Sequence, residues 1–156
     1  HRNDFKMRKF APVVFALVWL AILSPPASYA AGAASPIGTW ATEKKGAHIE
    51  IKDCGGKLCG TIVWLKNPHD KNGQDSIDSK NPEPALRSRK LLGMPLLNGF
   101  VQDSDSNVWT GGTIYDPDSG KTYSCKLTMQ DDGTMQVRGY VGISLLGQTQ
   151  IWTRVN

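Results

Sequence analysis

Residues that usually carry catalysis or bind metal ions are scarce in this sequence of 156 residues. It contains three histidines and three cysteines, and none of them forms a His-x-x-x-His or Cys-x-x-Cys pair with zinc-ligand spacing. Neither His48 nor His69 lies beside a serine or cysteine in a nucleophile-elbow pattern. We therefore predict that both histidines lie on the surface, and that the protein has no catalytic residue, no metal site and no cofactor.

The two acidic strings that begin at Asp70 and Asp103 lack the pattern of a calcium-binding loop. Such a loop needs glycine at its sixth position and a bidentate glutamate at its twelfth. Counted from Asp70, these positions hold Asp75 and Asn81, and the string that begins at Asp103 fails in the same way. We interpret both strings as solvated turns.

Only one long apolar run is present, at residues 10–23. A helix that spans a bilayer needs about 20 apolar residues, so a membrane anchor is the less favoured interpretation of this shorter run. Arg8 and Lys9 precede the run, and a tail with small residues at Ser28 and Ala30 follows it. This order is typical of a secretory signal peptide cleaved after Ala30. We expect residues 1–30 to be upstream residues plus this signal, and residues 31–156 to form one periplasmic or secreted domain with no membrane span after cleavage.

An excess of charge of one sign is also missing from the expected mature chain. The full sequence holds 18 basic and 14 acidic residues, but four basic residues and one acidic residue lie within residues 1–30. The remaining 14 basic and 13 acidic residues (18 − 4 and 14 − 1) nearly balance each other. A nucleic-acid-binding domain needs a basic face, so we predict no nucleic-acid partner.

Two of the three cysteines, Cys54 and Cys59, enclose a glycine-containing hairpin turn. Cysteines this close together in an exported chain favour a disulfide. A redox-active pair is less favoured, because such pairs are closer in sequence and lie at the start of a helix. Cys125 falls on the apolar phase of a predicted strand, and we expect it to be a buried free thiol.

Alternation of apolar and polar residues, broken by turn residues, dominates the sequence from residue 37 onward. Proline early in a turn and Asp-Gly at a hairpin tip are the residue types that tight turns need. The pattern predicts eight strands, at residues 37–42, 48–53, 58–65, 96–101, 107–115, 121–129, 134–141 and 147–155. We predict an all-β fold in which these strands form a single antiparallel eight-stranded barrel, with an open sandwich as the alternative.

Residues 66–90 form a polar segment that is too long for a hairpin connection. The sequence Asn81-Pro82-Glu83-Pro84 is typical of a helix start and predicts two helical turns over residues 85–92. We interpret the segment as an ordered flap with a short helix, lying across one end of the barrel. Arg87 and Arg89 in this flap suit bidentate binding of a carboxylate or phosphate, although a solvated charged surface explains them as well.

Ordered motifs run through the whole predicted barrel. They are Gly38-Thr39-Trp40, Cys54-Gly55-Gly56-Lys57-Leu58-Cys59-Gly60, Asp78-Ser79-Lys80-Asn81-Pro82, Leu86-Arg87-Ser88-Arg89, Trp109-Thr110-Gly111-Gly112-Thr113-Ile114-Tyr115-Asp116-Pro117, Gly120-Lys121-Thr122-Tyr123, Val137-Arg138-Gly139-Tyr140 and Gln150-Ile151-Trp152-Thr153-Arg154. The chain resembles, over residues 37–155, the bacterial exported family known as domain of unknown function 2147. The resemblance implies a lipocalin-like, calycin-type barrel in an exported protein, and it implies no reaction.

The resemblance also suggests which residues are structural. Lipocalin-like barrels begin with a Gly-x-Trp strand and place an arginine from the end of the chain over that indole, and the matching positions here are Gly38, Trp40 and Arg154. A guanidinium over an indole makes a favourable cation–π pair. Trp152 shares the phase of Arg154, so the two side chains are expected to point the same way.

Alternate positions of the predicted strands form an inward set that is mainly apolar: Ile62, Trp64, Ile114, Tyr123, Leu127, Val137, Val141 and Ile151. Three glycines, Gly60, Gly112 and Gly139, share the inward phases and would leave room for a ligand. A barrel of eight strands either encloses a small cavity or fills with side chains, and both outcomes stay open here. The candidate ligand-binding residues are Trp64, Arg87, Arg89, Ile114, Tyr123, Leu127, Arg138 and Val141.

The sequence thus favours a non-enzymatic exported barrel that binds a small, mainly apolar or amphipathic molecule in its interior. In this hypothesis Arg87 or Arg89 holds an acidic head group. The alternative is a periplasmic protein-interaction or inhibitor module that binds a protein partner through its end loops, residues 66–90 in particular. An enzyme is disfavoured, because the sequence contains no acid–base or nucleophile constellation.

Overall fold

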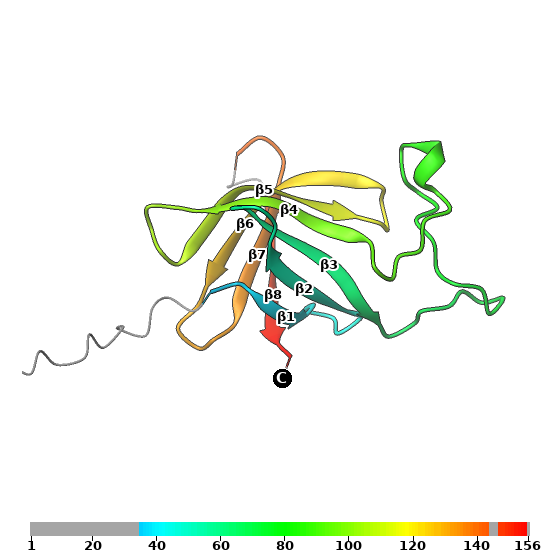
Figure 1. The fold of residues 1–156 in the computed structure, drawn as a ribbon, viewed down its shortest axis with the longest axis horizontal. Helices are drawn as coiled ribbons and strands as arrows, with labels where there is room; N and C mark the ends of the chain where they lie inside the picture. The colour runs from blue at the N-terminus through cyan, green and yellow to red at the C-terminus, as the bar shows by residue number, and fades with distance from the viewer. Residues whose placement is uncertain (1–34, 144–146, 156) are drawn as a thin grey trace, which may run out of the picture. The chain divides into compact units, whose positions relative to one another are not determined.

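The computed structural model describes residues 35–143 and 147–155, which form eight strands and one short 3-10 helix (Figure 1). The elements are β1 (Gly38–Ala41), β2 (Ala47–Asp53), β3 (Leu58–Leu65), η1 (Pro84–Leu86), β4 (Pro95–Gln102), β5 (Val108–Asp116), β6 (Lys121–Met129), β7 (Met135–Tyr140) and β8 (Gly147–Arg154). The apolar run at residues 10–23 and the predicted cleavage after residue 30 lie outside the described residues. Within the part of the chain that is described, no helix is long and apolar enough to cross a membrane.

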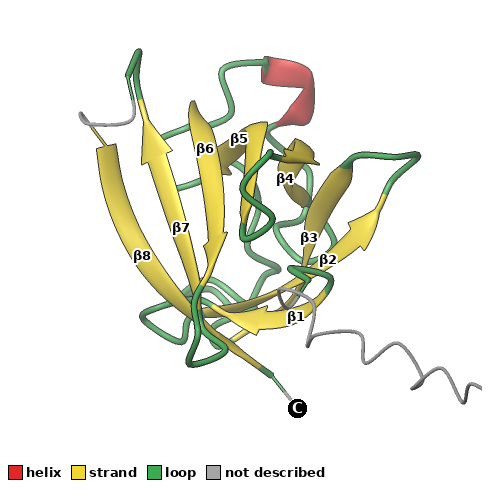
Figure 2. Ribbon diagram, turned by 90° about the vertical axis from the view of Figure 1, so that its left-hand side faces the viewer, coloured by secondary structure: helices red, strands yellow, loops and turns green. Residues whose placement is uncertain are grey.

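The eight strands form one closed sheet. Each strand pairs antiparallel with the next, and β8 pairs with β1 to complete the barrel (Figure 2). The predicted all-β, antiparallel eight-stranded barrel is therefore confirmed, and the open sandwich is excluded. Because the strands alternate in direction, the connections alternate between two ends. The β1–β2, β3–β4, β5–β6 and β7–β8 connections lie at what we call the flap end, and the other connections lie at the closed end.

The long β3–β4 connection, residues 66–94, is the flap, and it extends away from the barrel strands (Figure 1). Its helix is shorter than predicted, a single 3-10 turn at Pro84–Leu86 in place of two turns over residues 85–92. The helix ends early because the chain must return alongside the first half of the flap. The Asp78 N–H donates to the Arg89 carbonyl at 2.8 Å, and Ile77 pairs with Lys90 in an antiparallel bridge. The antiparallel bridge at Lys90 is incompatible with a helix that continues to residue 92.

Arg154 and Trp40 join the last strand to the first at the closed end. The Arg154 guanidinium lies 4.3 Å from the centroid of the Trp40 ring, and it donates to the carbonyls of Ser35 and Ile37 at 2.9 Å each. Gly38 has a φ of +134°, and a Cβ at this position would lie 2.6 Å from Arg154 Nη1. Glycine at this position therefore leaves space for the arginine. Trp152, on the same strand as Arg154, is buried.

Large apolar side chains fill the closed half of the barrel. The buried set includes Trp40, Ile51, Phe100, Trp109, Leu127 and Met135, and burying each such side chain stabilises the fold by about 1.5–3 kcal/mol. Two of the three inward glycines lie inside this packed core. A Cβ at Gly112 would lie 2.5 Å from the Phe100 ring, and one at Gly60 would lie 3.2 Å from Leu97. The space that we expected these two glycines to leave for a ligand is filled by protein.

The cysteines occupy two different environments. Cys54 and Cys59 form a disulfide across the β2–β3 hairpin, with their Cα atoms 5.9 Å apart, which confirms the predicted pairing. Cys125 on β6 is a free cysteine and fully buried. Burial raises the pKa of its thiol to about 12, so the reactive thiolate form is disfavoured at neutral pH.

Candidate functional site

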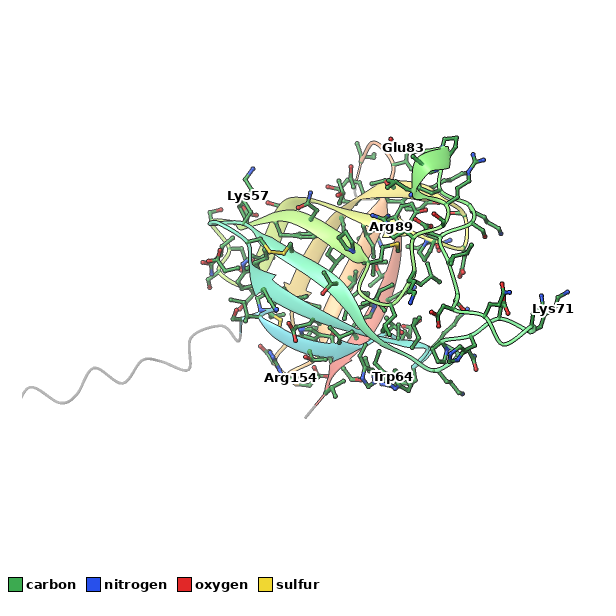
Figure 3. The ribbon with its side chains drawn as sticks, turned by 45° about the vertical axis from the view of Figure 1, so that its right-hand side comes forward. Lys57, Trp64, Lys71, Glu83, Arg89 and Arg154 are labelled. Carbon is green, nitrogen blue, oxygen red and sulfur yellow. A yellow bond between two sulfur atoms is a disulfide. The ribbon has the colours of Figure 1, made fainter. Side chains whose placement is uncertain are left out.

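A cavity of about 640 Å³ lies within the barrel at the flap end. Its floor consists of the buried side chains that border the packed core: Ile49, Ile62, Val137 and Trp152. The flap end and the closed end are opposite each other, as the positions of Lys71 in the flap and Lys57 in the β2–β3 hairpin show (Figure 3). Cavities that bind small molecules measure about 300–1,000 Å³, so this one is of suitable size.

The cavity walls are apolar near the floor and polar at the rim. Apolar contacts come from Ala47, Leu65, Leu91, Leu96 and Ile114, and the exposed Val141 also lines the cavity. Three tyrosines also border the cavity: Tyr115, Tyr123 and Tyr140. The polar groups at the rim include Lys44, Asp116, Asp118, Gln148 and Gln150. An apolar interior with a few polar groups at its mouth is the usual composition of a small-molecule site.

Of the predicted ligand-binding residues, the structure places Ile114, Tyr123 and Val141 on the cavity wall. Leu127 lies deeper, with no exposed surface, in the packed core beneath the cavity. It pairs with Trp109 on one side and Val137 on the other, and side chains fill the barrel at this level. Leu127 therefore supports the site from below and is not available to a ligand.

Trp64 lies on the outer surface of the barrel, and its predicted inward position is wrong. His48 pairs with Trp64 while the next residue of β2, Ile49, pairs with Ile62, so β3 has one extra residue, Val63, at this point. Such a β-bulge reverses the alternation beyond it. Leu65 consequently faces the cavity, and Trp64 stacks on His48 with ring centroids 4.4 Å apart.

Arg138 also lies outside the cavity, in contrast to its prediction as a ligand-binding residue. Its neighbours on β7, Val137 and Gly139, line the cavity, so Arg138 takes the opposite phase of the strand. The Arg138 Nη1 group donates to the hydroxyl of Thr149 on β8 at 2.7 Å. The contact joins two neighbouring strands on the outer face of the barrel.

The two flap arginines have partners within the flap. Arg87 is exposed, and its Nε group donates to the Asn81 carbonyl at 2.8 Å. Arg89 donates through Nη2 to the Asp78 carboxylate at 3.1 Å. Arg89 lies nearer to the barrel strands than Glu83 and Lys71 do (Figure 3). Neither arginine lines the cavity, so they are not placed to hold the head group of a ligand there.

Asp78 is the centre of a buried polar cluster between the flap and β5. Its carboxylate has no exposed surface and accepts hydrogen bonds from Tyr115 Oη at 2.6 Å, Asn81 Nδ2 at 2.8 Å and Arg89 Nη2 at 3.1 Å. Burial by itself raises the pKa of the Asp78 carboxyl, but these hydrogen bonds outweigh it and hold the pKa below its ordinary value. Burial and the bond to Asp78 raise the pKa of Tyr115 to about 12.

The flap also contacts the β5–β6 turn, which forms part of the cavity rim. Lys80 Nζ donates to the Asp118 carbonyl at 2.7 Å, and a Cβ at Gly120 would collide with the Lys80 carbonyl. Within the turn, Asp116 accepts hydrogen bonds from the Asp118 N–H at 2.9 Å and the Ser119 hydroxyl at 2.6 Å. Both carboxylate oxygens of Asp116 thus stabilise the turn.

Several residues of the site were not among the predicted ones. Asp78 and Asn81 belong to a motif quoted for the family resemblance, but nothing in the sequence marks that aspartate as buried. The polar residues that line the rim include Lys44, Gln148 and Gln150. Solvated loops contain the same residue types, so the sequence does not distinguish these three from ordinary surface residues. Among the described residues, no group of three potential metal ligands comes together.

The fold and its cavity define the class of protein: a lipocalin-like barrel that is open at one end. HP1028, a solved Helicobacter pylori protein described as belonging to the lipocalin family, has the same fold, with a TM-score of 0.67. It is 22% identical in sequence, and the match covers 78% of this chain and 84% of that one. The family of uncharacterized proteins conserved in bacteria, DUF2147, matches residues 38–154, and the chain belongs to this family. No curated protein matches the sequence at a significant level.

Proposed function

We propose that this protein is an exported binding protein that holds one small, mainly apolar molecule in the cavity of its barrel. The observation that carries the proposal is the cavity of about 640 Å³, with a floor of four buried apolar side chains. An apolar molecule that enters the cavity leaves water, and each Å² of apolar surface buried in this way stabilises the complex by about 25 cal/mol. The lipocalin-like fold is compatible with this activity.

The proposed activity is binding without catalysis. The carboxylate of Asp116 at the rim is occupied by its own turn, and the buried carboxylate of Asp78 is paired with Arg89 outside the cavity. The remaining contacts on the cavity wall are mostly aliphatic and aromatic side chains. Such a surface holds and orients a ligand, and the described residues that line it form no paired acid and base.

The proposal includes export to the periplasm or beyond. The leader-like sequence at residues 1–30 and the Cys54–Cys59 disulfide support an oxidising compartment. The intact mass of protein isolated from the periplasmic fraction tests this point. We expect a chain that begins at residue 31 and is lighter by two hydrogens, and a chain that retains residues 1–30 would contradict export by this route.

Native mass spectrometry of protein purified gently from its own cells tests binding directly. We expect an extra mass that persists in the folded protein and is released on denaturation. In parallel, the neutral fluorescent probe N-phenyl-1-naphthylamine should bind the protein with one probe per chain. An apo mass together with no probe fluorescence would contradict the proposed function.

A second candidate function is binding of a protein partner through the flap. The observation that favours it is the exposure of two apolar flap residues, Ile77 at 45% and Leu92 at 50%. Contiguous exposed apolar surface marks protein-interaction sites, and these two side chains would contribute to such a surface on the flap. Affinity capture from periplasm with the wild-type protein and with an Ile77→Ser, Leu92→Ser double variant tests the idea. A partner retained equally by both proteins would contradict it.

A further inference from the structure

The sheet is incomplete between β1 and β8 at the flap end, and we call this gap in the strand pairing the β1–β8 opening. β1 is only four residues long, and its pairing with β8 consists of Trp40 with Arg154 and Ala41 with Thr153. Among the described residues, no strand pairs with β8 on this side over residues 147–150. Gln148 and Gln150 pair across β7 with cavity-lining residues and therefore face inward, yet both are exposed. These two side chains therefore line the cavity and are also accessible to solvent.

The β1–β2 turn borders this opening and presents one lysine to the cavity. The Glu43 carboxylate accepts the backbone N–H of Ile151 at 3.0 Å, and Lys45 donates to the hydroxyl of Thr153. Lys44, between these two anchored residues, lines the cavity. No described residue forms an ion pair or hydrogen bond with the Lys44 ammonium group, so its three donors are available to a ligand.

Gln150 adds a second donor at the same opening. The indole N–H of Trp152 can only donate, and it donates to Gln150 Oε1 at 2.9 Å. This bond fixes the orientation of the amide, so the acceptor of Gln150 is used and its N–H groups stay available. We call Lys44 and Gln150 the head-group site. Both members offer N–H donors, and donors of this kind are complementary to an acceptor-rich anion.

The acidic residues that line the cavity lie away from Lys44, and the Glu43 carboxylate beside it is held by the Ile151 N–H. Asp116 and Asp118 belong to the β5–β6 turn, and β5 lies across the closed barrel from β1. Asp116 already accepts two hydrogen bonds, and the ammonium group of Lys80 lies against the backbone of Asp118. The acidic side therefore has a compensating cation nearby, whereas Lys44 has no ion-pair partner among the described residues.

We propose that the ligand is an amphipathic carboxylate, with its apolar chain on the cavity floor and its carboxylate bound by Lys44 and Gln150 at the β1–β8 opening. This inference rests on the proposed function, because it assigns a chemical class to the molecule in that same cavity. It also assigns the anionic head group to the wall opening and away from the flap arginines, which are engaged elsewhere.

Competition among three ligands with the same chain and different head groups tests the inference. Dodecanoate, dodecanol and dodecylamine should each displace N-phenyl-1-naphthylamine from the wild-type protein at neutral pH. We expect dodecanoate to displace the probe at a roughly tenfold lower concentration than dodecanol, as expected for one charge-assisted hydrogen-bond pair. Dodecylamine should be the weakest competitor, because its cation faces the Lys44 ammonium group.

Matched variants locate the head group. Lys44→Gln should remove the roughly tenfold advantage of dodecanoate and leave displacement by dodecanol unchanged, while Lys44→Arg should retain the advantage. Lys57→Gln, at the closed end, and Arg87→Gln, in the flap, are the controls and should behave as wild type. All of these positions are exposed, so the variants are expected to fold, and near-ultraviolet circular dichroism checks this.

The outcomes separate this inference from the function on which it rests. Equal displacement by all three ligands, or loss of the dodecanoate advantage in Arg87→Gln instead of Lys44→Gln, would overturn the head-group site while leaving the apolar cavity intact. Preference for dodecylamine would place the head group at the acidic rim and also overturn it. Failure of the probe itself to bind would remove the proposed function and this inference together.

Discussion

The hydroxyl of Tyr115 on β5 donates to the buried carboxylate of Asp78 in the flap at 2.6 Å. Tyr115 also borders the cavity, so the residue that holds the flap lies beside the ligand-binding space. The same carboxylate accepts hydrogen bonds from Asn81 and Arg89. The flap is therefore attached to the barrel by a buried polar cluster whose hydrogen bonds share the Asp78 carboxylate.

We expect Tyr115→Phe to lower the free energy of unfolding by about 2 kcal/mol, because the buried carboxylate loses one of its donors. Amide hydrogen exchange should increase in the flap, around residues 75–92, more than in the barrel strands. Urea denaturation and exchange mass spectrometry measure the two effects. Tyr140→Phe is the matched control, since Tyr140 also lines the cavity and its hydroxyl has no described partner. Equal stability of the two variants would contradict the prediction.

The stability of the protein should depend on Asp78 in acid. A carboxyl whose pKa is lower in the folded state stabilises the fold above its unfolded pKa, and the contribution is lost as the pH falls through the folded value. We expect the wild-type free energy of unfolding to fall more steeply than that of Asp78→Asn below about pH 4. Urea denaturation of both proteins from neutral pH into acid measures this. Asp75 and Asp132, whose pKa values are also lowered, are present in both proteins and cancel in the comparison. Parallel curves would rule out a stabilising Asp78 carboxylate.

Two inward glycines should differ in how much stability they lose when they are replaced by alanine. Gly112→Ala should cost about 1–3 kcal/mol, because the new methyl group would overlap the Phe100 ring. Gly139→Ala should be nearly neutral, since a Cβ there would lie 3.5 Å from Ile114, an ordinary contact. Gly139→Leu should instead keep the fold and weaken binding of N-phenyl-1-naphthylamine by filling the cavity. Thermal unfolding and probe titration measure these effects, and strong probe binding by a folded Gly139→Leu protein would argue against the cavity as its site.

Arg154→Ala should destabilise the barrel by about 1–2 kcal/mol, because it removes the cation–π contact with Trp40 and the two bonds to backbone carbonyls. Arg154→Lys should recover only part of this loss, since an ammonium group cannot reproduce the planar guanidinium fork. Urea denaturation measures both variants, with Lys57→Ala as a surface control. If Arg154→Ala matched that control in stability, Arg154 would not contribute to closing the barrel.

The fold was predictable because its signals are local. Alternation with a period of two and turn residues at each hairpin identify strands, and β3 and β6 have the bounds that the pattern predicts. The position of Trp64 was not predictable in the same way. A bulge adds a residue without disturbing the apolar composition of a strand, so Val63 gives no sign that the alternation reverses after it.

The candidate site was predictable only in part, because it depends on tertiary packing. Ile114, Tyr123 and Val141 follow from strand phase alone, whereas the burial of Asp78 requires the flap to fold against Tyr115. An aspartate in a polar segment has the same local sequence whether it is solvated or buried. The opening beside Gln150 likewise results from the difference in length between β1 and β8, which only strand pairing reveals.

Gly38 and Arg154 are neighbours, so a linker, a surface or a second domain can be joined to the barrel at one place through either of its ends. The barrel begins and finishes at the same end, while its cavity is lined by the opposite ends of the strands. A linker, a surface or a fused domain joined at either terminus of the barrel would hold every molecule in the same orientation, with the cavity mouth facing away from the attachment. Ligand exchange should therefore proceed from an immobilised form as readily as from the free protein.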